Sequence, residues 1–347
     1  MPRTIATLAR HSGARFARRG SLAIWVALAV LICVSPLVAS GSLGQSALLS
    51  MLPFAAFLII ASIGQTLVIQ QGGLDFSVPG AISLAAVIVT HHAGGDDGKV
   101  AVGVLLAIAA CTAAGALNGL LVARAGVPPI IATLGVNALL VGAATELSHR
   151  TVVAAPGNLS RFMLDKTVGL PNTLLIALGL TAVCALVTRR TVFGRLYEHA
   201  GTSPAAARIA GMPVARLQAF GYAAAGATYA VAGVCLAGYL RNPELDVGSP
   251  YLLSTVAAVV LGGASLSGGR ASVIATAGGA LFLSQIDQVV LSSGTQIWAQ
   301  YLIQGAAIGL GMVLRVIPAA MARRGPASQA RQPQEEEVPS PCPAVSR

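Results

Sequence analysis

The chain has 347 residues, of which 55% are hydrophobic and only 10% are charged. A soluble domain carries about 25% charged residues, so this composition leaves too little polar surface to cover a water-soluble fold of this size. The composition also excludes a disordered chain, which needs low hydrophobicity and high charge. The formal net charge is +10, but the basic residues form no stripe interleaved with aromatic residues. We therefore expect no nucleic-acid partner and a chain surrounded by membrane lipid.

Long apolar runs predict an all-α, polytopic membrane protein with about ten transmembrane helices, each of about 20 residues. Two of the runs, 78–92 and 251–263, are short, and we expect them to be tilted, re-entrant or broken helices. The expected organisation is a basic tail at 1–20, a transmembrane domain at 21–320 and a disordered tail at 321–347 that is rich in Pro, Gln and Glu. The predicted spans are 21–40, 47–69, 78–92, 100–123, 128–147, 172–188, 217–239, 251–263, 271–290 and 298–317.

The positions of Lys and Arg predict the orientation of these spans. With the N-terminus inside, 17 of the 22 basic residues fall on the inner side and five on the outer side. This split agrees with the enrichment of positive charge in cytoplasmic loops. An even number of spans then predicts that both termini lie in the cytoplasm.

The sequence contains no constellation that indicates catalysis. GxSxG, HExxH and paired-carboxylate patterns are absent. The segment Gly94–Val100 resembles a phosphate-binding loop, but its first glycine is one position off and Val100 replaces the hydroxyl residue that would hold magnesium. Four of the five cysteines lie in apolar runs and none forms a CxxC pair. We expect no enzyme activity, no metal and no cofactor.

Few polar side chains lie within the predicted spans. Gln65, Asn118 and Asn137 either contact a polyhydroxylated solute along a translocation path or form hydrogen bonds between helices. Asp287 lies deep in its span and either faces a water-filled path or lies near the outer mouth. Glu146 lies near a predicted span end, where solvent can hold its charge. Candidates for the translocation path are Gln65, Asn118, Asn137 and Asp287, although the interhelical interpretation explains the amides equally well.

The segment between the second and third predicted spans is a candidate functional turn. Gly72 and Gly73 allow a sharp change of direction. Asp75 and Ser77 can accept hydrogen bonds from free amides at the start of the next helix. A simple capped turn, with Asp75 held by solvent or by the cap, explains the same residues.

Two further patterns concern helix starts and helix packing. Pro128 and Pro129 are typical of the first turn of a helix. Gly115 and Gly119 form a small-xxx-small pair of the kind that brings two membrane helices close together.

The segment 191–216 is the longest internal hydrophilic stretch. Ser203 can cap a short helix at Pro204–Ile209, Gly211 can end that helix, and Pro213 prevents its continuation. A short capped helix on a cytoplasmic loop is suited to docking into the groove of another protein. A plain connector between spans is the alternative.

Four blocks together resemble the permease subunit of bacterial ABC importers for ribose and related monosaccharides, within the superfamily that includes branched-chain amino-acid permeases. The blocks occur in order over about residues 50–315. Pro79 departs from the family pattern, as do Ser203 and Ala205, which stand where Asn and Glu are common. The blocks are Gly72–Val78, Asn118–Leu121 with Pro128–Gly135, Phe193–Arg195 with Gly201–Met212, and Ala257–Ala271, which contains Gly262, Gly263, Gly268 and Gly269.

The resemblance implies a translocation pore and not an enzyme. It implies three kinds of protein partner: cytoplasmic ABC ATPase subunits, an extracytoplasmic solute-binding protein, and a second permease copy or a paralogue. It also implies that the loop containing Gly201, Ser203, Pro204 and Gly211 couples to the ATPase. Ser203 and Ala205 leave this loop with fewer polar side chains than is common in the family. We therefore expect the contact with the ATPase to be made by the packing of Ala206, Ala207, Ile209 and Met212 and by the charge of Arg208.

Two other interpretations remain open. The same machinery can serve a nucleoside or a branched-chain amino acid instead of a sugar. A proton-driven secondary transporter would use Asp287 or Glu146 in place of an ATPase partner.

Overall fold

The computed structural model describes residues 22–294, together with residues 298, 302, 305–306 and 309. The described chain is a bundle of helices with one very short hairpin, in which β1 (Lys166–Thr167) pairs antiparallel with β2 (Leu170–Pro171). In chain order the helices are Leu22–Val38, α2 (Gln45–Gln70), α3 (Val78–Ala93), the single 3-10 turn η1 (Asp97–Lys99), α4 (Val100–Ala123), α5 (Pro129–Ser148), α6 (Gly157–Leu164), α7 (Asn172–Arg190), α8 (Val192–Thr202), α9 (Pro204–Ile209), α10 (Val214–Leu240), α11 (Tyr251–Leu261) and α12 (Val273–Ser292).

Among the described residues, six helices are long and apolar enough to cross a membrane: α2, η1 with α4, α5, α7, α10 and α12. Three shorter apolar helices, Leu22–Val38, α3 and α11, coincide with further predicted spans. The runs predicted to be short are indeed short, with 16 residues in α3 and 11 in α11. This count does not confirm ten spans. The tenth predicted span lies mostly outside the described residues, and both predicted tails lie wholly outside them.

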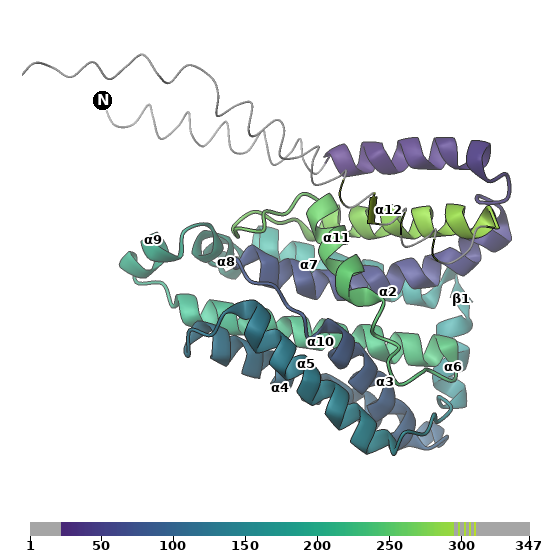
Figure 1. Cartoon of the computed structure of the whole chain (residues 1–347), viewed down its shortest axis with the longest axis horizontal. Coiled ribbons are helices and arrows are strands. Elements are labelled where there is room, and N and C mark those ends of the chain that lie inside the picture. Colours follow the sequence, from purple (N-terminus) through teal and green to yellow (C-terminus); the bar gives the residue numbers. More distant parts are fainter. Residues whose placement is uncertain (1–21, 295–297, 299–301, 303–304, 307–308, 310–347) are drawn as a thin grey trace, which may run out of the picture.

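The long helices run between two opposite ends of the molecule, as Figure 1 shows. One end carries α8 and α9, and the other carries α6 and the hairpin. The packing of α4 against α10 is antiparallel, because Gly115 lies against Tyr222 whereas Gly119 lies against Ala219, which comes earlier in α10. The start of α10 and the end of α4 therefore lie at the end that carries α8 and α9.

The helices divide into inner and outer ones by burial. The most apolar windows of α2, α10 and α12 are 67%, 67% and 72% buried, whereas those of α4, α5 and α7 are 22%, 28% and 33% buried. The outer helices expose large side chains such as Leu105, Leu139 and Leu186. A helix that is apolar all round and buried forms the core of a bundle. The exposed apolar faces of the others suit contact with lipid tails or with another apolar helix.

The close contact of α4 with α10 depends on glycine, as the sequence predicts for Gly115 and Gly119. A Cβ added at Gly119 would lie 2.5 Å from the Cα of Ala219, and one at Gly115 would overlap the backbone oxygen of Tyr222. Gly226 on α10 makes the reciprocal contact with the backbone of Cys111. Small residues thus let the two backbones touch, which maximises van der Waals contact where the hydrophobic effect between helices is weak.

We expect Gly226→Ala to destabilise the bundle, because its new methyl group would overlap the carbonyl oxygen of Cys111. Overpacking of this kind costs about 1–3 kcal/mol. Thermal unfolding in detergent should show a melting temperature several degrees lower. Gly142→Ala on α5 is the matched control, because nothing lies within 4 Å of its added Cβ. Equal melting temperatures for the two variants would contradict the close approach of α4 and α10.

Candidate functional site

The segment between α7 and α10 folds as two short helices at one end of the molecule (Figure 1). α8 begins where the Thr191 hydroxyl accepts a hydrogen bond from the amide of Gly194 at 3.0 Å. α9 begins where the Ser203 hydroxyl accepts from the amide of Ala206 at 3.4 Å. Gly211 follows α9 with φ +75°, a conformation that glycine adopts without strain. The predicted helix 204–209 and both of its end signals are confirmed, whereas α8 was not predicted.

α9 has one face anchored to its own chain and one face exposed. Ala207 is buried with Tyr197, Val214 and Leu217 in a small hydrophobic cluster. The expectation that Ala207 faces a partner is therefore wrong, because the side chain of Ala207 packs against α8 and α10 of the same chain. Met212 packs against the same cluster. Both Met212 and Pro204 are half-buried. The exposed face consists of Ala205, Ala206, Arg208 and Ile209, and the side chain of Ile209 is 90% exposed.

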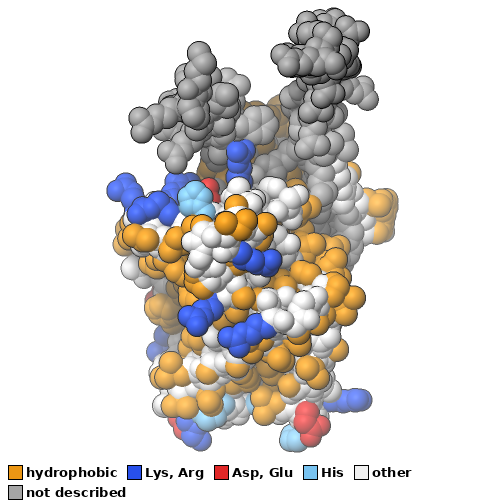
Figure 2. All heavy atoms as spheres, turned by 90° about the vertical axis from the view of Figure 1, so that its left-hand side faces the viewer, with side chains coloured by type: hydrophobic (Ala, Val, Ile, Leu, Met, Phe, Trp, Pro, Cys, Tyr) orange, Lys and Arg blue, Asp and Glu red, His pale blue; other side chains and the backbone are white. Residues whose placement is uncertain are grey.

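Positive charge surrounds this exposed face. Figure 2 views the molecule from the end that carries α8 and α9, and Lys and Arg side chains are spread over a mostly apolar and neutral surface there. Arg189 also donates a hydrogen bond to the Ser272 hydroxyl at 2.9 Å, which ties the end of α7 to the start of α12. Such a surface attracts an acidic partner. The exposed arginines on the helix ends and loops of this end are Arg124, Arg189, Arg190, Arg195, Arg208, Arg216 and Arg270.

The predicted turn between α2 and α3 is present, and its polar residues Asp75 and Ser77 are buried. Gly72 has φ +77°, and the side chain of Asp75 is 1% exposed. One carboxylate oxygen of Asp75 accepts hydrogen bonds from both the amide and the hydroxyl of Ser77. Asp75 thus accepts at the helix start as predicted, but protein and not solvent surrounds it. The expectation that Ser77 caps α3 through its side chain is wrong, because its hydroxyl is engaged with Asp75.

The predicted path amides are engaged in hydrogen bonds between elements. Asn118 on α4 donates to the hydroxyl of Ser77 at 2.9 Å. Gln65 on α2 accepts from the hydroxyl of Tyr229 on α10 at 3.1 Å. Asn137 on α5 accepts from the amide of Gly80 on α3 at 2.9 Å. These three amides therefore form hydrogen bonds between helices, as one of the two interpretations of the sequence expects. Their bonds involve α2, α3, α4, α5 and α10, with the turn between α2 and α3.

The two predicted acids lie elsewhere. Asp287 is half-buried within α12, and Glu146 is exposed near the end of α5. Asp287 belongs to α12, whereas the polar residues of the turn lie between α2 and α3. Among the described residues, Asp75 is the only buried acid, although its position near a predicted span end suggested solvent contact.

The proline pair and one glycine pair of the motif blocks have local structural roles. Pro129 is the first residue of α5 and Pro128 precedes it, as predicted. A Cβ at Gly262 would lie 2.6 Å from the amide nitrogen of Thr276, so this glycine lets the end of α11 touch α12. Gly263 has φ +106° and turns the chain after α11. Gly73 lies so close to the hydroxyl of Tyr222 that a side chain would collide with it.

Glycines from three motif blocks meet at one point, although they lie far apart in the sequence. A Cβ at Gly268 would lie 2.7 Å from the oxygen of Gly201 and 3.0 Å from the nitrogen of Gly72. A Cβ at Gly269 would lie 2.5 Å from the hydroxyl oxygen of Thr202. The turn after α2, the end of α8 and the loop after α11 therefore touch through their backbones. Sequence reasoning named these glycines but not their contact.

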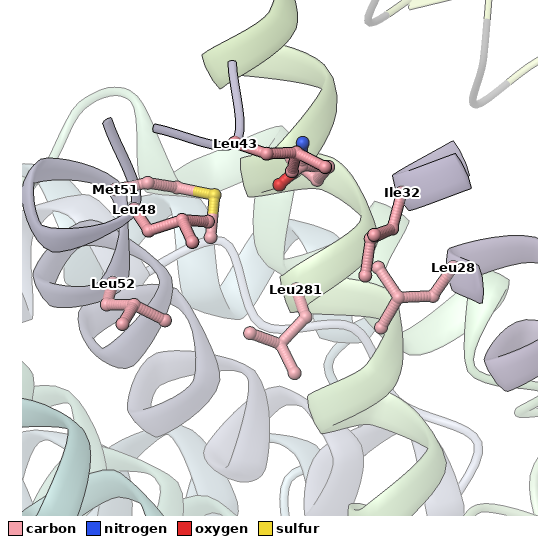
Figure 3. Close-up of a pocket in the computed structure, with 8 residues that line it drawn as sticks. Leu28, Ile32, Leu43, Leu48, Met51, Leu52 and Leu281 are labelled. Atoms are coloured by element: carbon pink, nitrogen blue, oxygen red, sulfur yellow. The ribbon is translucent and has the colours of Figure 1, made fainter. Parts of the chain in front are cut away.

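A cavity of about 320 Å³ lies elsewhere, between the helix Leu22–Val38, the start of α2, and α12. In Figure 3 its leucine, isoleucine and methionine side chains surround one apolar space. Gln285 also lines it, and its amide nitrogen is 3.1 Å from the hydroxyl of Ser35. Because its lining is almost wholly apolar, this cavity suits hydrocarbon better than a hydroxylated solute.

Comparison with known proteins identifies the family. Residues 47–310 match the family described as branched-chain amino acid transport system / permease component. The chain belongs to this permease family. It is 32% identical over 265 residues to the probable ABC transporter permease protein y4mJ of Sinorhizobium fredii (strain NBRC 101917 / NGR234), which covers 75% of this chain and 77% of that protein.

Other relatives are named as autoinducer 2 import system permease proteins, LsrD. That of Photorhabdus luminescens is 31% identical over 74% of this chain and 79% of its own length. That of Yersinia pseudotuberculosis serotype O:3 (strain YPIII) is 30% identical over the same shares. No solved structure matches the chain significantly. As a member of this family of ABC permeases, with its apolar helices, the chain is a multi-pass inner-membrane protein.

We expect Asp75→Ala to lower the stability of the permease. The change leaves the amide and the hydroxyl of Ser77 buried without the acceptor they have now, at a cost of about 2–4 kcal/mol. Asp75→Asn retains an acceptor oxygen and should cost less. The measurement is thermal unfolding in detergent.

The control is Asp96→Ala. Asp96 accepts from the amide of Gly98 at 2.8 Å in the same local geometry, but it is exposed. Its loss should change the melting temperature little. If Asp75→Ala were as stable as Asp96→Ala, the buried turn would not contribute to the fold as described.

Proposed function

We propose that the chain is the transmembrane subunit of an ATP-binding cassette importer. It forms the translocation pathway for a monosaccharide or a sugar-like solute, and a separate cytoplasmic subunit hydrolyses ATP. The observation that carries the proposal is the exposed face of α9. An isoleucine that is 90% exposed on a capped helix, beside an exposed arginine, is suited to a groove in another protein.

The anchoring of α9 supports this role. A docking helix transmits force only if it is fixed to its own subunit, and Ala207 fixes α9 against Tyr197 and Leu217. Val214 of the same cluster is the first residue of α10, which is one of the inner helices. Movement of α9 therefore acts directly on the bundle.

The proposed partners follow from this arrangement and from the family. Two cytoplasmic ATPase subunits dock at the basic end, and a second permease copy or a paralogue completes the pore. An extracytoplasmic binding protein delivers the solute at the end that carries α6 and the hairpin. The positive charge around α9 supports a cytoplasmic position for that end by the positive-inside rule, and in this proposal both chain termini are on the same side.

The direction of transport comes from state-dependent contacts. A solute that bound two pore conformations equally would shift neither. ATP binding closes the ATPase pair, the coupling helices move with it, and the pore changes its open side. Gln65, Asn118, Asn137 and Asp287 remain candidates for solute contact in such an open state.

The sugar-like solute is inferred from the motif resemblance, and the relatives' names add autoinducer 2 to the candidates. A nucleoside or a branched-chain amino acid fits the same machinery. Measuring which of these compounds raises the melting temperature of the partner binding protein identifies the cargo. A proton-driven carrier, by contrast, would lose uptake when a protonophore is added and would need no ATPase subunit.

We expect Ile209→Glu and Arg208→Glu each to reduce copurification of the ATPase subunit at least tenfold, which corresponds to about 1.4 kcal/mol of binding free energy. The first removes the exposed apolar contact and the second reverses the charge beside it. The control is Val168→Glu, because Val168 is 93% exposed in the hairpin at the opposite end. Unchanged copurification for both α9 variants, with uptake abolished only by a protonophore, would contradict the proposal.

A further inference from the structure

The last turn of α2 is held by two segments that are distant in sequence. The backbone oxygen of Gln70 accepts a hydrogen bond from the amide of Gly269 at 2.7 Å. The same oxygen lies against Gly201 so closely that any Cβ there would overlap it. Both glycines are buried. The end of α2, the end of α8 and the loop after α11 therefore share one backbone contact.

Side-chain hydrogen bonds strengthen the same contact between α2 and α8. The hydroxyl of Tyr197 donates to the backbone oxygen of Leu67 at 2.8 Å, and the amide nitrogen of Gln71 donates to the backbone oxygen of Tyr197 at 2.7 Å. A tyrosine phenol is a hydrogen-bond donor at physiological pH, and burial raises the pKa of Tyr197 further above its usual range. α8 is thus fixed to α2 by its backbone as well as by its side chains.

The residues that follow Gln70 in the chain form the turn between α2 and α3. The chain passes from Gln70 through Gly72 to Asp75 and Ser77 without an intervening helix. The amide of Phe76 donates to the hydroxyl of Thr133 on α5 at 3.0 Å, and Ser77 accepts from Asn118 on α4. A displacement of the end of α2 therefore reaches α4 and α5 through the turn.

We infer that the contact of Gly201 with Gln70 and Gly269 is the joint through which α9 moves the buried turn 71–77. The inference rests on the proposed function, because it requires a motor that displaces α9. Gly201 and Tyr197 are positioning residues in this account. They touch neither the ATPase groove nor the solute, and they act through α2.

Backbone contact makes this joint stiff. Long side chains at the contact would absorb a displacement by changing rotamers, whereas two backbones in contact pass it on. Without such a joint, α8 and α9 would act on the bundle through α7 and α10 alone, the latter including the contact of Phe193 with Phe220, whose ring centroids are 4.8 Å apart. The joint adds a third point of action, at the break between α2 and α3.

The test uses the assembled complex of permease, ATPase subunits and binding protein, and it needs no knowledge of the solute. Hydrogen exchange of residues 71–77 is compared before and after the ATPase is trapped with ATP and vanadate. Trapping should change the exchange of this segment in the wild type. In Gly201→Ala the change should shrink about fivefold or more, while ATPase copurification and the response of α9 are retained.

Tyr197→Phe is the second variant, because it removes one hydrogen bond without overpacking the contact. It should weaken the response of residues 71–77 in the same direction, by about twofold or more. The matched controls are Gly179→Ala, where nothing lies within 4 Å of the added Cβ, and Tyr239→Phe at the opposite end of α10. Both controls should respond as the wild type does.

The outcomes separate the inference from the proposed function. A full response of residues 71–77 in both joint variants would overturn the inference and leave the importer intact. Loss of ATPase copurification in both joint variants would also overturn it, because the contact would then only shape the docking surface. Failure of the wild-type chain to copurify any ATPase subunit would instead overturn the proposed function.

Discussion

The last turn of α2 ends inside the protein, and its backbone oxygens need hydrogen-bond donors there. A helix leaves its last four carbonyl groups without partners of its own, and in an apolar medium each unpaired group costs several kcal/mol. Gly269 supplies the donor for Gln70, and the phenol of Tyr197 supplies a donor for Leu67. The end of α2 therefore needs the contacts that α8 and the loop after α11 make with it. The rest of the site depends on this requirement.

The same constraint applies to the chain between α2 and α3. Because the chain that leaves α2 at Gln70 stays largely inside the protein, the backbone of the following turn must find its hydrogen-bond partners there. Asp75, Ser77 and Thr133 provide that satisfaction, and α3 then completes the path as a helix of 16 residues. Irregular backbone at membrane depth is tolerated only where protein or a cavity surrounds it. The polar residues around the turn are therefore needed by the fold, whatever contacts they also make during transport.

The sequence predicts the ends of two helices correctly. Ser203 and Gly211 bound the helix of α9, and Pro129 begins α5, because capping and backbone preferences act within a few residues. The depth of Asp75 was not predictable in this way. The burial of Asp75 depends on how α2, α4 and α10 pack together. The sequence of any one of these segments does not determine that packing.

Two further differences between the prediction and the structure concern the segment between α7 and α10. α8 was missed because its charged residues hide an apolar stripe, although Phe193, Tyr197 and Ala200 have the spacing of one helix face. Ala207 is expected from the sequence to face a partner, but it is buried in a hydrophobic cluster with Tyr197 and Ala200 of α8. The glycine motifs were recognised singly, and only the fold shows that three of them meet.

The central claim is that α9 lies on the cytoplasmic side, seated in a separate ATPase. Its most direct test is labelling of Ala206→Cys with a membrane-impermeant maleimide, in a chain whose exposed Cys33 and tail Cys342 are replaced by serine. The account predicts labelling in inside-out vesicles stripped of ATPase, protection when the ATPase subunits are added back, and no labelling from outside intact cells. Labelling from outside intact cells would contradict it.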